Sequence, residues 1–217
     1  MARYDGHADW YAERLAAFTA VGTERLAGLL GAGPGRCLEV GCGGGAHLSA
    51  LAGLGWTIVG GDLSADQLRV ARRRVPEAPL LLADAAALPI ARGSLDAVVM
   101  AFVHTDLDDL PGAVGEAARV LRPGGRLVHL GVHHCFVGPF ARYRAEAPPI
   151  LLPGYRDTAW TDDAPGFGDG LRRVVGARHV PLAELVNVVA GAGLRIERAD
   201  EPGSADYPGV LALVARR

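Results

Sequence analysis

Residues 37–45 are the stretch that most constrains the fold of this 217-residue chain. Their sequence, CLEVGCGGG, is an apolar run of strand length that breaks into a glycine-rich turn. Glycine has no Cβ and adopts positive φ without strain, so a turn of this kind lets a ligand touch the backbone. A helix is expected directly after it, and its free N–H groups would favour negative charge at the same place. The stretch therefore predicts a strand, a turn and a helix arranged around a ligand.

Two aspartates follow at the ends of the next two predicted strands. Asp62 lies about twenty residues beyond the glycine-rich turn, and Asp84 ends the strand after it. A carboxylate at the position of Asp62 can accept hydrogen bonds from both hydroxyl groups of a ribose. That geometry serves any adenosine, NAD included, so Asp62 predicts a nucleotide site without identifying the cofactor.

The rest of the chain alternates short apolar runs with helical patterns. The predicted strands are 36–42, 57–62, 80–84, 95–102, 126–132, 194–200 and 209–215. The predicted helices lie within 1–30 and at 45–54, 64–74, 109–121 and 182–192. Strands that are apolar almost throughout are typical of a parallel sheet covered on both faces. The alternation predicts an α/β, doubly wound fold, with residues 1–217 forming one domain.

Four motifs, in this order, resemble the Rossmann-like (class I) S-adenosylmethionine-dependent methyltransferases, in particular the type 11 group. They are LEVGCGGG at 38–45, GGDLSADQLRVAR at 60–72, LLADAAALPIARGSLDAVV at 81–99 and RVLRPGGRLVHLG at 119–131. The resemblance covers residues 22–132 strongly and the C-terminal part weakly, through LAELVNVVAGAGLRI at 182–196. It implies a seven-stranded sheet of order 3-2-1-4-5-7-6 whose last strand is antiparallel, with an insertion after strand five.

In the resembling family the glycine-rich turn lies against the methionine and ribose portions of S-adenosylmethionine. The cofactor-binding residues that the resemblance implies are Tyr11, Glu39, Gly41, Cys42, Gly43, Asp62, Leu63, Gln67, Asp84, Ala85 and Val103. Glu39 would hold the loop and the cofactor's amino group, although N–H groups of the loop could also satisfy its carboxylate. Asp84 would accept a hydrogen bond from the adenine amino group, or else form a turn. Tyr11 would cover the cofactor from a helical cap of residues 1–30, or simply pack.

Histidines follow two of the predicted strands. His104 comes after the strand at 95–102, and His133 and His134 come after the strand at 126–132. Methyl transfer from a sulfonium requires an aligned acceptor, exclusion of water and, for some acceptors, removal of a proton. Imidazole is the usual base near neutral pH. We therefore predict His104, His133 and His134 as catalytic candidates, with the two adjacent histidines pointing opposite ways.

Other interpretations of the histidines stay open. His129 lies within a strand and is expected to be a satisfied core residue, whereas His179 could reach the pocket from the insertion. A metal site is a further alternative. The ligand types at the strand ends are His104, Asp106, His133 and His134. Methyltransferases of this fold that use a divalent ion hold it mainly through carboxylates and an amide, which suit Mg²⁺. The pattern here differs, so no metal is expected.

Residues 133–180 interrupt the rhythm of strands and helices. They contain Pro139, Pro148, Pro149, Pro153 and Pro165, and no clear periodicity. They also carry nearly half of the aromatic residues of the chain: Phe136, Phe140, Tyr143, Tyr155, Trp160 and Phe167. A long irregular segment in a compact domain is usually functional. We predict a substrate-covering insertion, with a small satellite core or a dimer contact as the alternatives.

Composition narrows the class of substrate. A formal net charge of −2 at pH 7 argues against a general nucleic-acid binder. Every basic residue is arginine, which indicates a GC-rich bacterial genome rather than an activity. The three cysteines do not suggest a disulfide framework, and neither a signal peptide nor a membrane-spanning run is visible. We expect a cytoplasmic monomer or homodimer that acts on a small molecule, without a nucleic-acid or membrane partner.

The resemblance implies an enzyme that transfers the methyl group of S-adenosylmethionine, leaving S-adenosylhomocysteine. The acceptor would be an O, N or activated C atom of a small, apolar or aromatic molecule, and a role in secondary metabolism fits. Three alternatives stay open. An NAD-dependent or nucleotide-sugar oxidoreductase would need a Tyr-x-x-x-Lys proton donor, and the chain has no lysine. A protein could bind the cofactor or its product without catalysis. An RNA or protein methyltransferase would need a basic or peptide-binding groove.

Overall fold

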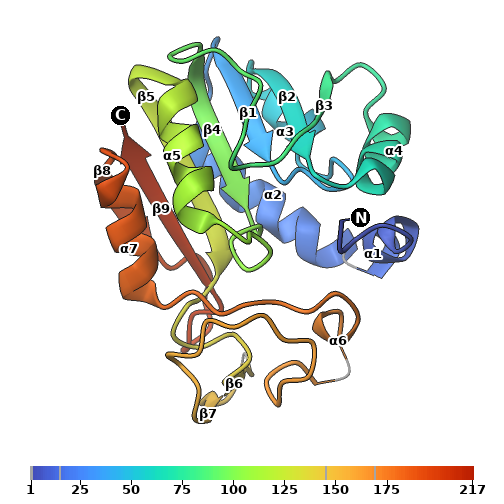
Figure 1. The fold of residues 1–217 in the computed structure, drawn as a ribbon, viewed down its shortest axis with the longest axis vertical. Coiled ribbons are helices and arrows are strands. Elements are labelled where there is room, and N and C mark those ends of the chain that lie inside the picture. Colours follow the sequence, from blue (N-terminus) through green and yellow to red (C-terminus); the bar gives the residue numbers. More distant parts are fainter. Residues whose placement is uncertain (1, 15, 145, 169) are drawn as a thin grey trace.

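A mixed, seven-stranded sheet forms the centre of the molecule (Figure 1). The computed structural model describes residues 2–14, 16–144, 146–168 and 170–217. The strands of the sheet are β1 (Arg36–Val40), β2 (Thr57–Asp62), β3 (Leu80–Leu82), β4 (Leu95–Ala101), β5 (Leu121–Val132), β8 (Arg195–Asp200) and β9 (Val210–Arg216). Their order is β3-β2-β1-β4-β5-β9-β8. Strands β1 to β5 pair in parallel, and β9 runs antiparallel to both β5 and β8. The predicted fold class, strand order and antiparallel last strand are confirmed.

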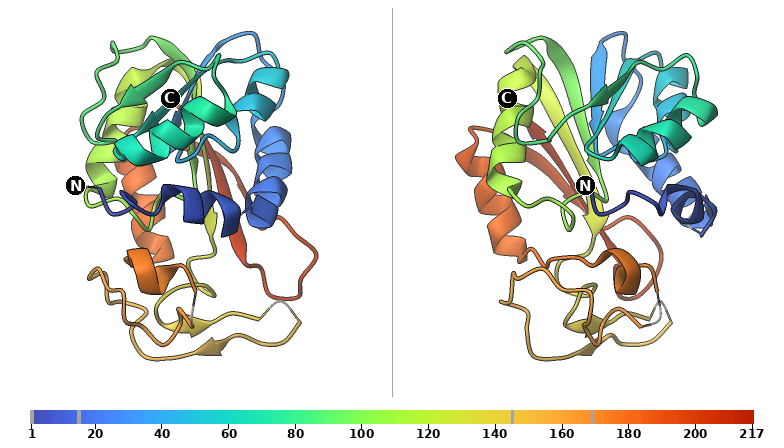
Figure 2. Two further views of the ribbon diagram at one scale, coloured as in Figure 1. Left: turned by 90° about the vertical axis from the view of Figure 1, so that its right-hand side faces the viewer. Right: turned by 45° about the vertical axis from the view of Figure 1, so that its right-hand side comes forward.

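Helices cover both faces of this sheet, as a doubly wound fold requires (Figure 2). They are α1 (Ala8–Arg14), α2 (Ala16–Leu30), α3 (Leu48–Gly53), α4 (Ala65–Arg74), α5 (Leu110–Val120), α6 (Arg172–Val175) and α7 (Leu182–Gly191). Helices α5 and α7 bury Val114 and Leu185 in one core, and α2 and α3 bury Leu26 and Leu51 in the core on the opposite face. Within the part of the chain that the structure describes, no helix has the length and apolar character needed to cross a membrane.

Side-chain caps set where two of these helices begin. The hydroxyl of Ser64 accepts a hydrogen bond from the backbone N–H of Gln67 at 3.1 Å at the start of α4. The carboxylate of Asp109 accepts one from the N–H of Gly112 at 2.8 Å at the start of α5. The first N–H groups of a helix have no partner inside it, so these caps stabilise the beginning of each helix. They also hold the preceding loops at the carboxyl ends of β2 and β4.

Several predicted boundaries are wrong by a few residues, for local reasons. Strand β1 ends at Val40 rather than at residue 42, because the chain turns at Gly41 with φ of +68°. The helix expected from residue 45 begins only at Leu48, after the glycine-rich turn. Strand β5 begins at Leu121, five residues earlier than 126, because residues before a register shift already pair with β4. The helical stretch predicted over 1–30 is two helices, and residues 1 and 15 of it lie outside the described residues.

The insertion over 133–180 lies beyond the carboxyl ends of the strands (Figures 1 and 2). Its regular elements are the pair β6 (Ala141–Arg142) and β7 (Ile150–Leu151) and the short α6. The rings of Phe140, Tyr155 and His179 pack against one another with centroids 4.6–5.2 Å apart. Phe140 is only 3% exposed. The insertion therefore contains a small aromatic core of its own, which was one of the alternatives for this segment.

Candidate functional site

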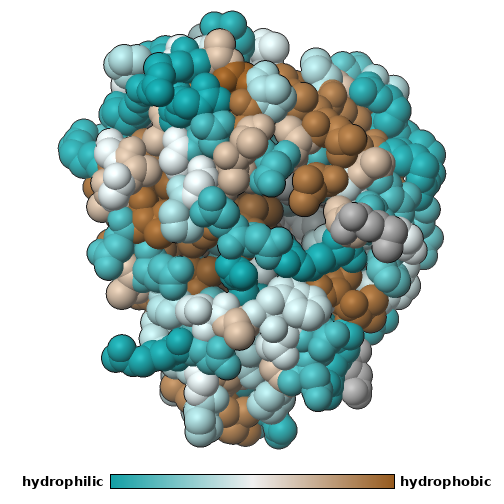
Figure 3. All heavy atoms as spheres, viewed as in Figure 1, coloured by the Kyte–Doolittle hydropathy of each residue, from teal (hydrophilic) through white to brown (hydrophobic). Residues whose placement is uncertain are grey.

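A pocket opens at the carboxyl ends of β1, β2 and β4, and the space-filling view shows a hollow there (Figure 3). The predicted cofactor residues that line it are Tyr11, Gly41, Gly43, Asp62, Leu63, Gln67, Asp84, Ala85 and Val103. The remaining two, Glu39 and Cys42, line a smaller pocket that shares Tyr11 and the glycine-rich turn with the first. In doubly wound sheets ligands bind at this edge, where the strand order reverses. The structure thus brings all the predicted cofactor residues together around one continuous region.

The glycine-rich turn takes a conformation that side chains disfavour. Gly41 has φ of +68°, and a Cβ placed on it would lie 2.4 Å from Cγ2 of Val103. Gly43 has φ of +51° and faces the side-chain oxygen of Gln67. Between them, the N–H of Cys42 donates to the carbonyl of Gly61 at 3.0 Å, so its backbone continues the pairing with β2. The two glycines therefore allow the turn to pass close to β4 while exposing backbone to the pocket.

Asp62 ties the turn to the start of α4. One carboxylate oxygen accepts the N–H of Gly43 at 2.8 Å, and the other accepts the N–H of Ser64 at 2.8 Å. Burial raises the pKa of this carboxyl above its ordinary value, although the hydrogen bonds from Ser64 and Gly43 act in the opposite direction. A carboxylate oxygen can accept two hydrogen bonds, and each of these two oxygens accepts only one from the main chain. Both can therefore still accept a bond from a ligand hydroxyl. This arrangement suits a ribose with its two adjacent hydroxyl groups.

Two buried acceptors face the same turn without a partner among the described residues. Glu39 is 1% exposed and its Oε2 has no hydrogen bond, while Gln67 is 2% exposed and its Oε1 has none. Burial, and secondly the charge of Asp62, raise the pKa of Glu39 to about 8. A buried acceptor left unpaired costs about 1–3 kcal/mol. Both side chains are therefore arranged for a donor that a ligand would bring, and a cationic donor would stabilise the charged form of Glu39.

Asp84, Ala85 and Leu63 form the outer wall of the pocket. Oδ1 of Asp84 accepts the N–H of Ala86 at 2.9 Å, so this residue does form a turn just after β3. It also lines the pocket, and the two predicted interpretations of Asp84 are compatible. The side chain of Leu63 is 57% exposed beside it. An exposed apolar side chain next to a polar edge suits a flat heteroaromatic ring.

A charged network that the sequence interpretation missed closes the opposite side of the pocket. The guanidinium of Arg172 donates to Asp106 Oδ1 at 2.6 Å and to the hydroxyl of Thr105 at 2.9 Å. The hydroxyl of Tyr4 donates to Asp106 Oδ1 at 3.0 Å. Burial followed by the charge of Asp106 raises the pKa of Tyr4 well above its usual range. The network joins the N-terminal segment, the loop after β4 and the insertion, three regions that no local sequence motif connects.

Tyr11 stands against this network at the edge of the pocket. Its ring packs edge to face against that of Tyr4, with centroids 5.0 Å apart, and it lines both pockets. Burial raises the pKa of Tyr11 to about 12, so it is neutral at physiological pH. The N-terminal segment therefore contributes two neutral phenols to the wall of the site.

The predicted catalytic histidines do not line either pocket. His104 and His134 lie against each other, with ring centroids 4.5 Å apart, and His129 joins them at 5.1 Å from His104. His133 points elsewhere, and its Nε2 lies 2.9 Å from a carboxylate oxygen of Glu201. Adjacent side chains on extended backbone alternate in direction, so the predicted divergence of His133 and His134 is confirmed. The expectation that the histidines surround the methyl position is corrected, because tight turns after β4 and β5 direct them into the protein interior.

The arrangement of Asp106 and His133 also removes the metal-ligand set considered from sequence. Asp106 is engaged by Arg172 and Tyr4, whereas His133 faces Glu201, so neither joins His104 and His134. His179 packs in the aromatic core of the insertion rather than in the pocket. His129, expected to be a satisfied core residue, is 2% exposed and has an Nε2 without a partner among the described residues. The expectation for His129 is therefore confirmed for its burial and wrong for its hydrogen bonding.

Strand order, topology and the position of the pocket define the fold of the class I S-adenosylmethionine-dependent methyltransferases. Residues 38–129 match the family model described as a methyltransferase domain. A crystal structure of an S-adenosylmethionine-dependent methyltransferase from Mesorhizobium loti superposes with a TM-score of 0.71 over 98% of this chain and 99% of that chain, at 22% identity. The resemblance inferred from the four motifs is confirmed, and the cofactor that the matched domain and these structures imply is S-adenosylmethionine.

Two further proteins that are similar to this chain are named for different reactions. A curated demethylmenaquinone methyltransferase from Renibacterium salmoninarum is 38% identical over 125 residues, which is 57% of this chain and 53% of that protein. The match thus spans about half of the length of this relative. The crystal structure of the cyclase SpnF has a TM-score of 0.64 and 20% identity, over 90% of this chain and 80% of that chain. The same fold is therefore found in a protein named for a different reaction, so the fold alone does not define the chemistry.

The polar groups around the turn fit the implied cofactor. S-adenosylmethionine carries an ammonium group, a carboxylate and a ribose diol. Glu39 offers a buried acceptor without a partner, and Asp62 offers two oxygens already oriented by the main chain. The apolar side chain of Leu63 and the polar edge at Asp84 lie on the far side of Asp62 from the turn. The acceptors on the two sides of the turn therefore agree with the amino group and the ribose diol of this cofactor.

Proposed function

We propose that this protein transfers the methyl group of S-adenosylmethionine to a small molecule. The observation that carries the proposal is the pair of carboxylates, buried Glu39 and half-buried Asp62, at the two sides of one glycine-rich turn. A simple dinucleotide site needs the ribose acceptor but has no use for a second, unpaired carboxylate beside the turn. An ammonium group supplies the cationic donor that Glu39 lacks.

The proposed division of roles follows from these contacts. Asp62 would accept from the ribose hydroxyls, and Glu39 from the amino group of the methionine portion. Leu63 and Ala85 would pack on the adenine, with Asp84 at its amino edge. Once bound, the cofactor supplies an electrophilic methyl group on a sulfonium. The protein then has to exclude water and align the acceptor with that methyl group.

The acceptor side of the pocket supports a small, apolar or aromatic molecule. Tyr4, Phe102, Val103 and Leu107 contribute to its wall together with Asp106. The curated relative is named for demethylmenaquinone, which supports a small-molecule acceptor rather than a macromolecule. Whether an O, N or activated C atom receives the methyl group depends on the acceptor. We keep all three as part of the proposal.

Proton removal is the step for which sequence and geometry suggest different groups. The sequence predicts a histidine base, but no histidine lines the larger of the two pockets within the described residues. Tyr4 and Asp106 are among the polar residues that do line it, and their side chains are hydrogen-bonded to each other. We therefore propose that an acceptor needing deprotonation hands its proton to the carboxylate of Asp106, either directly or by way of the Tyr4 hydroxyl, which donates to that carboxylate. A histidine base stays a prediction without a contact to the pocket.

The insertion over 133–180 is proposed to cover the acceptor, as predicted from sequence. Its Arg172 reaches the pocket wall through Asp106 and Tyr4, which supports this role. The role in secondary metabolism, the cytoplasmic location and the monomeric or homodimeric state also stay predictions.

A methyl-transfer assay tests the proposal. The protein is incubated with methyl-labelled S-adenosylmethionine and a panel of phenols, amines and quinols, and formation of S-adenosylhomocysteine is measured. Turnover that depends on one class of acceptor supports the proposal. Tight cofactor binding with no turnover on any acceptor would instead favour a binding protein, or a reaction such as that for which the cyclase is named.

Asp62→Ala is the variant that tests the proposed ribose contact. Affinity for S-adenosylhomocysteine should fall at least about 100-fold, because two ribose hydroxyls lose a charged acceptor. Asp96→Ala is the matched control, since Asp96 accepts the N–H of Arg36 at 2.7 Å and binds Arg122 at the opposite end of the strands. Equal affinities for wild type and Asp62→Ala would remove Asp62 from the ribose site.

A further inference from the structure

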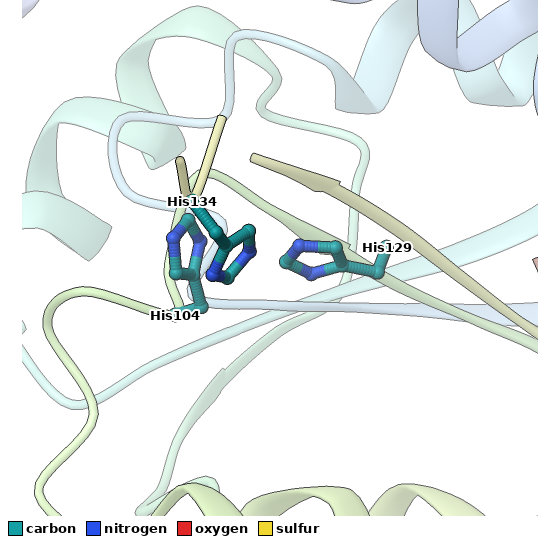
Figure 4. A group of neighbouring side chains, drawn as sticks. All are labelled: His104, His129 and His134. Atoms are coloured by element: carbon teal, nitrogen blue, oxygen red, sulfur yellow. The ribbon is translucent and has the colours of Figure 1, made fainter. Parts of the chain in front are cut away.

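Three buried imidazoles meet between β4, β5 and the start of the insertion (Figure 4). His104 follows β4, His129 lies within β5, and His134 comes just after it. Their exposed fractions are 2%, 2% and 1%. One ring nitrogen from each lies within 4.8 Å of a ring nitrogen of both others. Figure 4 shows the rings turned toward a common centre from three separate backbone positions.

One ring nitrogen of each histidine is buried and has no hydrogen-bond partner among the described residues. These atoms are Nδ1 of His104, Nε2 of His129 and Nε2 of His134. Gly131 leaves room for two of them, because a Cβ there would lie 2.5 Å from Nδ1 of His104 and 3.0 Å from Nε2 of His129. Each buried nitrogen without a partner is unfavourable by itself. Three such atoms on rings that lie together indicate a ligand that accepts three lone pairs.

The contact of His134 with the main chain fixes its tautomer. Nδ1 of His134 lies 2.6 Å from the carbonyl oxygen of Val180, and a carbonyl can only accept. Nδ1 therefore carries the proton, and in the neutral ring Nε2 holds a lone pair directed at the cluster. Histidines that bind metals usually donate their second ring N–H to a backbone carbonyl or a carboxylate in this way.

Burial and the closeness of the three imidazoles favour the neutral form of each ring. Burial, and next the neighbouring imidazoles, lower the pKa of His104 well below its ordinary value. The same two causes lower the pKa of His129 to about 3. Arg172 lies near enough to act on His104 but is already paired with Asp106. Neutral imidazole is the form that binds a metal ion, so no proton has to be displaced.

We propose that His104, His129 and His134 bind one divalent transition-metal ion, with zinc the expected occupant. Imidazole nitrogens suit zinc, copper, nickel and iron, and zinc accepts three histidines in a tetrahedral site. Zn–N bonds of about 2.0–2.1 Å place the three nitrogens ~3.4 Å apart, so the rings need only approach slightly. A water molecule completes the tetrahedron, and its loss of a proton on the metal would reduce the buried charge.

The proposed site is structural and lies outside the methyl-transfer pocket. None of its three histidines lines either pocket within the described residues. The ion would connect the ends of β4 and β5 to each other. Through the hydrogen bond from His134 to Val180 it would also hold the segment that leads into α7. It would thus fix the base of the insertion, a segment whose own regular structure is slight.

Metal content tests the proposal directly. The purified chain is dialysed against a chelator, titrated with Zn²⁺, dialysed again and analysed by elemental mass spectrometry. One zinc per chain is expected, with a rise in Tm of about 5–10 °C at a free metal concentration ~100 times Kd. Co²⁺ in place of Zn²⁺ should give the visible absorption of a tetrahedral site. A chain that retains no metal, and whose Tm does not change when Zn²⁺ is added, would overturn the proposal. The three nitrogens would then be better explained by a buried water molecule.

Two variants assign the ion to these side chains. His129→Gln removes a direct ligand of the ion. Loss of a residue that only orients a ligand weakens metal binding by up to ~100-fold, so this variant should weaken zinc binding by more than that. His133→Gln is the matched control, because this adjacent buried histidine faces Glu201 and should leave the metal content at one per chain. If His129→Gln fails to fold, His134→Gln and the Co²⁺ spectrum of wild type decide the assignment. Undiminished zinc in a folded His129→Gln or His134→Gln variant would contradict it.

Discussion

The glycine-rich end of the molecule and the insertion end hold their polar groups in different ways. Around the turn after β1, Asp62 accepts two backbone N–H groups and each partner lies within about twenty residues of it. In the insertion, Arg172 reaches Asp106 and Tyr4, 66 and 168 residues away in the chain. The first arrangement follows from main-chain geometry, whereas the second depends on side chains brought together by the whole fold. A motif can encode the first, but only the structure reveals the second.

The largest expected effect comes from breaking the contact of the insertion with the site. Asp106→Ala leaves Arg172 without its counter-charge, although the two side chains are 14% and 22% exposed. We expect unfolding to become easier by about 2–4 kcal/mol, below the value for a fully buried pair because solvent screens part of the interaction. Chemical denaturation followed by circular dichroism measures the change.

A double variant tests whether the loss of stability in Asp106→Ala comes from the unpaired charge of Arg172. Asp106→Ala combined with Arg172→Met should be more stable than Asp106→Ala alone, because no unpaired charge remains. Additive losses in the double variant would show that the two side chains act independently, and the network would then not couple the insertion to the pocket.

At the glycine-rich end a smaller effect should come from the backbone. Gly41→Ala forces an alanine into φ of +68° and a Cβ into Val103, at an expected loss of about 1–3 kcal/mol in stability together with weaker cofactor binding. Gly115→Ala is the control, because Gly115 lies inside α5 with nothing within 4 Å of a Cβ. That variant should gain about 0.5–1 kcal/mol. Equal effects of the two substitutions on stability would contradict the strained turn.

A further effect at the glycine-rich end is spread over several pH units, a pH dependence at Glu39. Its folded-state pKa of about 8 lies above that of an unfolded glutamate, so the free protein should lose stability as pH rises from about 4.5 to 8. The contribution of this one group has a maximum slope of about 1.4 kcal/mol per pH unit. Glu39→Gln should remove it, becoming the more stable protein at pH 8 and no more stable near pH 4.5. Parallel Tm profiles for the two proteins would show that Glu39 is not the titrating group.

Bound cofactor should act on the same group. An ammonium beside Glu39 favours its charged form, so binding at pH 7 should release a proton from wild type and not from Glu39→Gln. Calorimetry in buffers of different ionisation enthalpy measures the difference between the two proteins.

Sequence patterns predicted the sheet and the cofactor region because both depend on local rules. Apolar strands, the cap at Ser64 and the glycine-rich turn each leave a signal within a few residues, and the structure has them in the expected order. Strand ends were less accurate, since Leu121 pairs with β4 across a register shift that no pattern announces.

The histidines are residues whose surroundings sequence patterns do not predict. His104 and His134 were recognised as strand-end residues, but the direction of each side chain depends on turns that the sequence does not specify. His129 was placed in the core, correctly for its burial and wrongly for its hydrogen bonding. Its spacing from Gly131 puts both on one face of β5 and was a signal that could have been used. Arg172 had no signal at all, because its partners come from the loop after β4 and from the N-terminal segment.

The central claim is that the turn between Glu39 and Asp62 binds S-adenosylmethionine. Isothermal titration of the wild-type chain with S-adenosylmethionine, S-adenosylhomocysteine and NAD, repeated with Asp62→Ala, tests it most directly. We expect one binding site for each of the first two ligands, none for NAD, and a loss of at least about 100-fold in affinity in the variant. Binding of NAD alone, or equal binding of S-adenosylhomocysteine by the variant, would contradict it.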